Sequence, residues 1–268
     1  MEPLEGGPIP YRQIRLLRED TLTEVVHAVD ANGVEVIVKR LNRREGIAAD
    51  PVGIRRFERE IALSVALDHP GLARVASHGD NWIAFECLEH PLANQERQNL
   101  LATLDGVASL IGMLGETLAY LHSRGIVHRD VKPAHVMFRG KQPVLIDLGV
   151  AGLVGGDPLD GTELVGSPAW MAPEQIAGAE PEPSADIWSL CAVGLTLVRG
   201  RPLFSGSPEE VLDQRRNKTR DPVCLSGYLE GAPGLKAILE TGLGEAGSRP
   251  SAAAIAAALR SSRHPGAG

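Results

Sequence analysis

Cysteine is scarce in this sequence. The 268 residues contain three cysteines, Cys87, Cys191 and Cys224, and no two of them form a Cys-x-x-Cys pair. Such spacing provides neither a disulfide framework nor the paired thiolates of a structural zinc site. A reducing compartment suits a chain of this kind, so we expect a cytoplasmic protein.

Long apolar runs and an excess of positive charge are also missing. The longest apolar run, residues 187–198, is too short to span a bilayer, so we expect a buried helix and no membrane segment. The first ten residues, MEPLEGGPIP, lack the basic start and apolar stretch of a signal peptide. The formal net charge of −7 argues against nucleic acid as a partner, because such binding requires basic patches. The hydrophobic fraction of 43% is still ample for a buried core.

The most informative stretch is HRDVKPAHVMF, residues 128–138. A helix-like apolar run ends directly before it, so the polar triplet HRD is expected on a loop. A short apolar strand, residues 144–146, then places a second carboxylate, Asp147, on a turn. Two carboxylates on loops, Asp130 and Asp147, with Lys132 between them suit one task. They can orient a hydroxyl and hold a metal-bound phosphate.

Three motifs together carry a resemblance to a known family. HRDVKP is followed by DLG at residues 147–149 and by MAPE at residues 171–174, in the order and spacing of protein kinases. The chain resembles the eukaryotic-type Ser/Thr protein kinases that also occur in bacteria. The resemblance implies an α+β fold of two lobes, a small β-rich N-lobe with one helix and a larger, mainly α-helical C-lobe. The implied organisation is a leader over 1–10, an N-lobe over 11–88, a C-lobe over 89–260 and a frayed tail over 261–268.

The pattern of the N-lobe predicts strands and one helix. Alternation predicts strands over 11–17, 24–29, 34–41, 72–78 and 82–88, and helical spacing predicts a helix over 57–67. The resemblance assigns Lys39 to the phosphates of the nucleotide and Glu60 to an ion pair with Lys39. Taken alone, each of these two residues also fits a solvated charge. The resemblance further assigns the backbone from Glu86 to Leu88 to the adenine edge, with Phe85 at the back of the adenine pocket.

The C-lobe pattern is mainly helical. We expect two helical segments over 100–123, a mobile stretch after Gly149, a buried helix over 184–200 that begins with a capping pattern, and an Ala-rich helix over 251–259. Asp186 is expected to brace the catalytic loop by accepting backbone hydrogen bonds. Arg249 resembles the arginine that pairs with the glutamate of MAPE, here Glu174.

The resemblance implies the transfer of the ATP γ-phosphate to a protein hydroxyl. Asp130 would orient the hydroxyl and accept its proton, Lys132 would reach the transferring phosphate, and Asp147 would bind the divalent ion. The implied cofactors are ATP with Mg or Mn, and Lys132 favours Ser/Thr over Tyr substrates. Arg129 suits the docking of a phosphorylated activation loop, for which Thr162 is the better acceptor.

Two departures from the kinase pattern concern ATP and the metal. Where the family has GxGxxG, residues 18–23 read REDTLT, with no glycine and with the Asp20 carboxylate near the expected triphosphate. The same run also fits a short hairpin connection. Where the family has a metal-binding Asn, this chain has His135. Imidazole suits Mn²⁺ better than Mg²⁺, so His135 either ligates a metal or fills the site and hydrogen-bonds to Asp130.

Two functions of different classes follow from the sequence. The first is a Ser/Thr protein kinase with weakened nucleotide and metal binding, favoured by the retained Lys39, Glu60, Asp130, Lys132 and Asp147. The second is a pseudokinase that acts as a binding or allosteric module, favoured by the missing glycines and the Asn-to-His change. A small-molecule kinase is a third interpretation. It fits less well, because the GSPAW and MAPE segments resemble a docking loop for a protein substrate.

Overall fold

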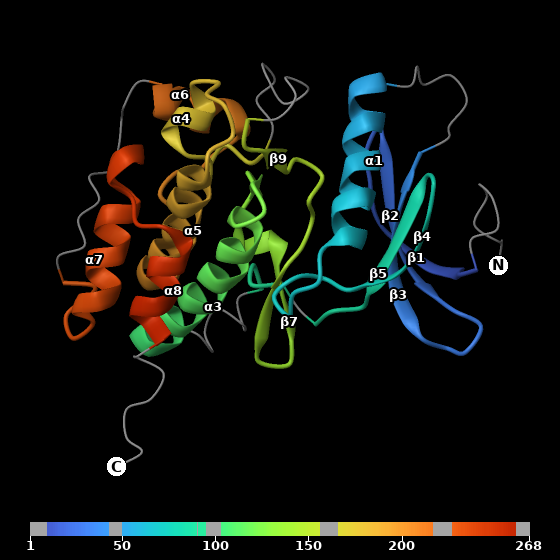
Figure 1. The fold of residues 1–268 in the computed structure, drawn as a ribbon, viewed down its shortest axis with the longest axis horizontal. Coiled ribbons are helices and arrows are strands. Elements are labelled where there is room, and N and C mark those ends of the chain that lie inside the picture. The colour runs from blue at the N-terminus through green and yellow to red at the C-terminus, as the bar shows by residue number, and fades with distance from the viewer. Residues whose placement is uncertain are drawn as a thin grey trace, which may run out of the picture. The chain divides into compact units, whose positions relative to one another are not determined.

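The chain forms two compact units (Figure 1). This computed structural model describes residues 10–42, 50–89, 91–94, 103–155, 166–216 and 227–260. The predicted leader, apart from Pro10, and the predicted tail lie outside these ranges. The first unit comprises Met1–Asp68, Leu72–Glu89 and Asp147–Gly149, and the second comprises His69–Gly71, His90–Ile146 and Val150–Gly268.

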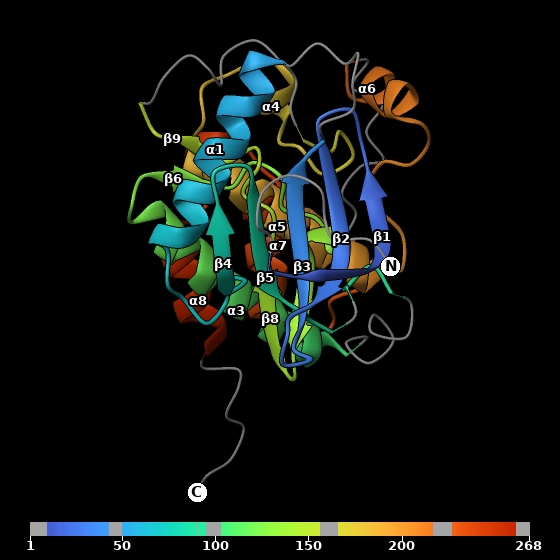
Figure 2. The same ribbon diagram turned by 90° about the vertical axis from the view of Figure 1, so that its right-hand side faces the viewer.

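The first unit is built on a five-stranded antiparallel sheet in the order β1-β2-β3-β5-β4 (Figure 2). The five predicted strands of the N-lobe are present, with bounds that differ by a few residues. They are β1 (Arg12–Glu19), β2 (Thr23–Val29), β3 (Glu35–Leu41), β4 (Val75–Gly79) and β5 (Trp82–Glu86). Between β2 and β3, the Asn-Gly turn has Gly33 at a φ of 83°, a conformation that glycine adopts without strain.

Alternation along the strands gives the sheet two different faces. Val26, Val38 and Ala84 are paired across β2, β3 and β5, and all three are fully buried. Their neighbours along the strands point to the opposite face, where Lys39 lies between Val25 and Ile83. One face therefore carries the buried cluster of Val26, Val38 and Ala84, while the other carries Lys39 beside the buried Ile83.

The helix α1 (Pro51–Ala66) lies alongside the sheet (Figure 1). Phe57 and Ile61 pack with Ile83 of β5 into one buried cluster. The helix begins six residues before the predicted start at residue 57, because the apolar spacing does not reveal its first turn. The start is set by Asp50, whose carboxylate accepts hydrogen bonds from the first free backbone amides, and by a proline at the first helical position.

The second unit is mainly helical. Its longer helices are α3 (Leu104–His122), α5 (Pro183–Arg199), α7 (Pro233–Gly242) and α8 (Ala252–Arg260), and its shorter ones are α4 (Pro173–Ile176) and α6 (Pro208–Arg216). Two small antiparallel sheets join β6 (Ile126–Val127) to β9 (Gly152–Leu153) and β7 (Val136–Arg139) to β8 (Gln142–Leu145). A 3₁₀ turn, Pro133–His135, lies between β6 and β7.

Two predictions for these helices are wrong in part. From residue 104 onward the predicted pair of helical segments is one continuous helix, α3, and residues 100–102 lie outside the described residues. A Cβ at Gly115 would lie 3.3 Å from the Ala252 carbonyl oxygen, so this glycine allows α8 to approach closely. The predicted capping pattern of α5 does not form either. That helix begins at Pro183 after Glu182, whose side chain makes no capping hydrogen bond, because the proline presets the first helical φ.

Among the described residues, α3 is long and apolar enough by composition to cross a membrane. Over half of its most apolar window is buried inside the protein, where it packs on α5 and α8. A core helix has the same properties, so the helix is weak evidence for a membrane span. The predicted buried helix over 187–198 is confirmed as part of α5, which is buried over most of its length.

Candidate active site

In the first unit, Lys39 forms a cluster with two carboxylates. Its Nζ donates hydrogen bonds of 2.8 Å to both carboxylate oxygens of Glu60 and one of 3.1 Å to Oδ1 of Asp147. β3 supplies the lysine, α1 supplies Glu60, and the turn after β8 supplies Asp147. The ion pair predicted between Lys39 and Glu60 is present.

Burial and charge shift the pKa values in this cluster. Burial lowers the pKa of Lys39, but the carboxylates of Glu60 and Asp147 outweigh that effect and leave its pKa above the ordinary value. Glu60 is only 2% exposed. Its burial, together with the charge of Asp147, raises its pKa from 4.5 to about 7 although Lys39 opposes the shift. The cluster thus contains one cation and more carboxylate charge than that cation neutralises.

The turn that carries Asp147 is tightly constrained. Asp147 has a φ of 67°, in the left-handed region, and its Oδ1 accepts a 3.1 Å hydrogen bond from the Gly149 N–H. A Cβ at Gly149 would lie 3.0 Å from both Asp147 Oδ1 and Glu60 Oε2. Glycine at this position therefore lets the backbone pass close to the charged cluster.

The segment that replaces the glycine-rich run is a tight turn closed by Asp20. The Asp20 N–H donates to the Thr23 carbonyl at 2.9 Å, and Asp20 Oδ1 accepts from the Leu22 and Thr23 N–H groups at 2.9 and 2.7 Å. Burial raises the pKa of Asp20, but these hydrogen bonds and Arg18 outweigh it and lower the pKa below the ordinary value. The alternative interpretation of a short hairpin connection is therefore correct for the geometry. In this turn the Asp20 carboxylate accepts the hydrogen bonds of two backbone N–H groups, those of Leu22 and Thr23.

The predicted adenine-binding segment follows β5. The Glu86 N–H donates to the Arg74 carbonyl at 3.0 Å, and its side-chain Oε1 accepts from the Arg74 N–H at 2.8 Å. Its backbone N–H is therefore engaged within the unit, and any contact of Glu86 with an adenine must use another group. Leu88 follows the end of the strand. Phe85 packs against the cluster of Phe57, Ile61 and Ile83.

In the second unit, the catalytic loop is attached to α5. Asp186 is fully buried, and its two oxygens accept 2.8 Å hydrogen bonds from the backbone N–H groups of His128 and Arg129. His122 of α3 contacts the same carboxylate through Nε2 at 2.8 Å. The predicted bracing by Asp186 is therefore present. It holds Arg129 at a φ of 68°, a conformation that is unfavourable for residues other than glycine.

Asp130 is buried, and its two carboxylate oxygens differ. Oδ2 accepts a 2.7 Å hydrogen bond from Lys132 Nζ, which also donates to Ser167 Oγ at 2.6 Å. Oδ1 is buried and has no hydrogen-bond partner among the described residues. A Cβ at Gly166 would lie 3.4 Å from that oxygen, so the chain passes close to it without supplying a donor. An unpartnered buried acceptor is costly, and this one has the chemistry to accept a hydrogen bond from a hydroxyl.

His135 is buried beside Asp130. Its Nδ1 is 3.1 Å from the Asp130 carbonyl oxygen and 3.4 Å from Asp130 Oδ2. Because a carbonyl oxygen can only accept, Nδ1 carries a proton in this contact, and in the neutral ring Nε2 then has the lone pair. The hydrogen bond to Asp130 that the sequence left as one alternative is therefore present. A second hydrogen bond that fixes the ring and its tautomer is also the usual arrangement of a metal-binding histidine.

The MAPE segment is joined to the segment before α8. Arg249 pairs with Glu174 through both terminal nitrogens of its guanidinium, one of them at 3.0 Å, and also donates to the Ser184 carbonyl at 2.9 Å. The predicted pair is therefore present. The sequence interpretation missed Gln175, whose Nε2 donates to the Arg129 carbonyl at 3.0 Å. Its position directly after MAPE was the available signal. Thr162 lies outside the described residues.

The comparison with known families agrees with this geometry. The protein kinase domain family matches residues 11–226, most of the chain. The chain belongs to this family, and the predicted α+β class, with a β-sheet unit and a helical unit, is confirmed.

The relatives are bacterial Ser/Thr protein kinases, as the sequence motifs predict. The chain is 35% identical over 209 residues to serine/threonine-protein kinase PknA of Mycobacterium tuberculosis, which covers 73% of this chain and 48% of PknA. It is 34% identical to serine/threonine-protein kinase PkaA of Streptomyces coelicolor, over 68% of this chain and 35% of PkaA. The chain thus spans about half the length of PknA and a smaller share of PkaA.

Proposed function

We propose that this chain is a Ser/Thr protein kinase that transfers the γ-phosphate of ATP to a protein hydroxyl. Its relatives are named as Ser/Thr protein kinases, which favours this function over the pseudokinase alternative. The observation that carries the proposal is the buried Oδ1 of Asp130, which lacks a donor within the described residues. The substrate hydroxyl would donate to this oxygen and later release its proton to it.

The neighbours of Asp130 support the same role. Lys132 holds the other oxygen, Oδ2, and thereby fixes the orientation of the carboxylate. The ammonium group of Lys132 also carries the positive charge that would offset the charge of a transferring phosphate. Ser167, on the other side of Lys132, belongs to the segment we propose as the docking site of the protein substrate.

The Lys39 cluster supports nucleotide binding in the first unit. Its hydrogen bonds to Glu60 hold the ammonium group at a fixed place on the sheet face. In that position Lys39 would bind the phosphates of ATP, and we propose that the backbone near Glu86 and Leu88 meets the adenine.

Members of the family use a divalent ion, and each unit contains one residue with suitable donor chemistry. Asp147 offers carboxylate oxygen, the donor that Mg²⁺ and Mn²⁺ prefer, and a neutral His135 ring with its proton on Nδ1 would offer nitrogen. When bound, the ion would supply neutralisation of phosphate charge. Because His135 offers nitrogen rather than oxygen, we propose that Mn²⁺ supports the reaction better than Mg²⁺.

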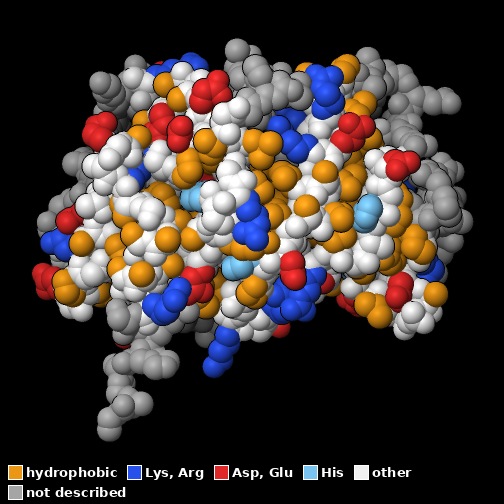
Figure 3. Space-filling model, viewed as in Figure 1, with side chains coloured by type: hydrophobic (Ala, Val, Ile, Leu, Met, Phe, Trp, Pro, Cys, Tyr) orange, Lys and Arg blue, Asp and Glu red, His pale blue; other side chains and the backbone are white. Residues whose placement is uncertain are grey.

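The partner and the compartment are proposals of the same kind. We propose a protein substrate and no nucleic acid. On the face seen in Figure 3, the Lys and Arg side chains of the described residues are interspersed with Asp and Glu, which suits this choice. The scarcity of cysteine supports a cytoplasmic location.

The test is transfer of radiolabelled phosphate from ATP to a mixture of Ser- and Thr-containing peptides, with Mg²⁺ or Mn²⁺. We expect transfer by the wild type, and a loss of at least about 100-fold in Asp130→Asn. Asp80→Asn, which changes an exposed carboxylate in the turn after β4, is the matched control and should retain activity. His135→Asn should shift the preference from Mn²⁺ towards Mg²⁺.

Two outcomes would contradict the proposal. If the wild type transfers no phosphate with either ion while binding ATP, the chain is a pseudokinase. If Asp130→Asn transfers phosphate as fast as Asp80→Asn does, then Asp130 is not the catalytic carboxylate. The unfolding midpoint of each variant in urea shows whether a loss of activity reflects a loss of fold.

A further inference from the structure

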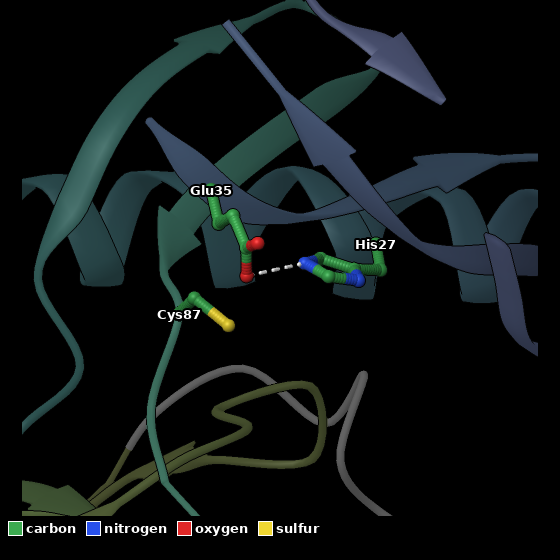
Figure 4. Close-up of side chains that lie close together, drawn as sticks. All are labelled: His27, Glu35 and Cys87. Carbon is green, nitrogen blue, oxygen red and sulfur yellow. Dashed lines mark hydrogen bonds and ion pairs between the residues drawn. The ribbon is translucent and has the colours of Figure 1, made fainter. Parts of the chain in front are cut away.

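A second group of ligand-type side chains lies in the first unit, apart from the Lys39 cluster. His27 of β2, Glu35 at the start of β3 and Cys87 directly after β5 place a nitrogen, an oxygen and a sulfur within 4.8 Å of one another. His27 Nε2 is 3.0 Å from Glu35 Oε2. Figure 4 shows the three side chains pointing toward one another, His27 and Glu35 from two strands and Cys87 from the coil directly after β5. The proposed kinase reaction uses none of them.

The sheet itself brings these residues together. His27 pairs with Ile37, so Glu35, two residues before Ile37, lies on the same face of the sheet as His27. Glu86 pairs with Val36, and Cys87, the next residue, therefore lies beside Glu35. Because hydrogen-bonded strands fix the three backbone positions, only side-chain torsions must change to bring the ligand atoms closer.

We propose that His27, Glu35 and Cys87 form a binding site for a zinc ion with one open coordination position. Imidazole nitrogen, thiolate sulfur and carboxylate oxygen are the three donor types that Zn²⁺ accepts in proteins. Around a tetrahedral zinc ion such donors are separated by about 3.5 Å, given bond lengths of roughly 2.0 to 2.3 Å. The long Glu35 side chain, 57% exposed, can move to close the remaining gap.

The three side chains also differ in charge, since Glu35 is the one carboxylate of the three, beside the His27 nitrogen and the Cys87 sulfur. Three protein ligands and one open position distinguish this arrangement from the four-ligand sites of structural zinc domains.

The site has a defined relation to the proposed nucleotide contacts. Cys87 stands between Glu86 and Leu88 in the sequence, the two residues proposed to meet the adenine. Glu35 is four residues before Lys39 on the same strand and therefore on the same face of the sheet. The zinc site does not depend on phosphate transfer, since its ligands are separate from Lys39, Asp130 and Asp147.

The experiment titrates the purified full chain with Co²⁺ as a spectroscopic probe and then displaces the cobalt with Zn²⁺. We expect one ion per chain and a thiolate-to-cobalt charge-transfer band. The variants His27→Gln, Glu35→Gln and Cys87→Ser should each weaken zinc binding by at least about tenfold, measured by competition with a chromophoric chelator. Cys87→Ser should also abolish the band.

Matched controls separate this site from adventitious binding. His78→Gln and Glu58→Gln change exposed side chains of the same unit, and Cys224→Ser removes a thiol outside the described residues. All three should bind cobalt and zinc as the wild type does. The proposal is overturned if the wild type shows no thiolate band, if Cys224→Ser removes that band, or if His27→Gln and Glu35→Gln bind zinc as tightly as the controls. Thermal unfolding by circular dichroism verifies that each variant is folded.

Discussion

At the scale of single residues, the shared cation Lys39 has the largest electrostatic consequence. Two carboxylates, Glu60 and Asp147, depend on one ammonium group, and Glu60 is the more deeply buried of the two. Burial, with a smaller contribution from the charge of Asp147, raises the pKa of Glu60 to about 7 although Lys39 opposes the shift. Glu60 therefore gains a proton near neutral pH, where a solvated glutamate would be ionised.

This shift predicts a pH dependence of stability. Because the pKa of Glu60 rises from 4.5 to about 7 on folding, its contribution is fully present below 4.5 and is lost as the pH rises towards 7. We expect the wild type to lose stability relative to Glu60→Gln over this window, by an amount on the order of 3 kcal/mol or less. Urea unfolding at a series of pH values measures the difference. Glu58→Gln, an exposed change on the same helix, should follow the wild type, and parallel curves for wild type and Glu60→Gln would refute the shift.

Single residues also show what the sequence could reveal. The pair of Lys39 and Glu60 was predictable, because the family pattern specifies both positions. The raised pKa of Glu60 was not, since it depends on burial by the fold and on Asp147, 108 residues away from Lys39 in the chain. The same holds for Asp130, whose proposed role follows from the family pattern, whereas its unpartnered Oδ1 depends on the path of the chain near Gly166.

At the scale of elements, the hairpin of β1 and β2 bears most directly on the proposed binding of ATP. Its turn is closed by Asp20, which occupies the N–H groups of Leu22 and Thr23. In a glycine-rich loop such amides bind phosphates. We therefore expect the Asp20 carboxylate to oppose a triphosphate in two ways. Its negative charge repels the phosphates, and it already accepts the hydrogen bonds that the Leu22 and Thr23 N–H groups could donate to them.

Two substitutions separate these effects. Asp20→Asn removes the charge but keeps an oxygen acceptor for the amides, whereas Asp20→Ala removes both. We expect ATP to bind several-fold more tightly to Asp20→Asn, since a charge near the phosphates costs about 1 kcal/mol, and more tightly still to Asp20→Ala. Isothermal titration calorimetry measures both affinities.

The neighbouring hairpin offers a matched control for this prediction. Asp30 closes the turn between β2 and β3 in the same way, with its Oδ1 2.8 Å from the N–H groups of Asn32 and Val34. Asp30→Asn should leave the ATP affinity unchanged. If Asp20→Ala binds ATP no better than Asp30→Asn does, the turn does not oppose the nucleotide.

The sequence predicted which segments are strands and helices better than it predicted where the helices begin and end. The five strands of the sheet followed from alternation. The early start of α1 and the unbroken course of α3 did not, because both depend on local contacts that apolar spacing does not record. Asp50 caps α1, and Gly115 in α3 allows the close approach of α8.

At the scale of the whole molecule, buried hydrogen bonds and an ion pair join distant parts of the second unit. Asp186 joins α5 to the loop at His128 and Arg129 and to His122 of α3. Arg249 joins the segment before α8 to Glu174. The family pattern predicts both the bracing by Asp186 and the pair of Arg249 with Glu174, whereas periodicity and composition indicate neither.

We expect Asp186→Asn to destabilise the chain strongly. The amide offers one acceptor oxygen where two were used, and buried donors of the catalytic loop lose their partner, at a cost on the order of 3 kcal/mol. The hydrogen bonds and the charge of His122 outweigh burial and hold the pKa of Asp186 below its ordinary value. Its contribution is therefore present above pH 3.8 and is lost as the pH falls further.

Urea unfolding measures the effect of Asp186→Asn, with Asp105→Asn on the exposed start of α3 as the control. The control should cost no more than about 1 kcal/mol. Equal midpoints for the two variants would show that Asp186 contributes no more than an exposed carboxylate does.

The left-handed backbone of Arg129 and Asp147 has a consequence for how such a chain evolves. Glycine is the most relaxed residue at a φ of 67° or 68°, yet it lacks the side chains that a kinase uses there. At each position the side chain needed for activity lowers stability, because the left-handed conformation costs a residue such as arginine roughly 1 to 2 kcal/mol. A lineage released from selection for phosphate transfer would gain stability by drifting to glycine at these two sites. The residues that stand there now are the ones such drift would remove first.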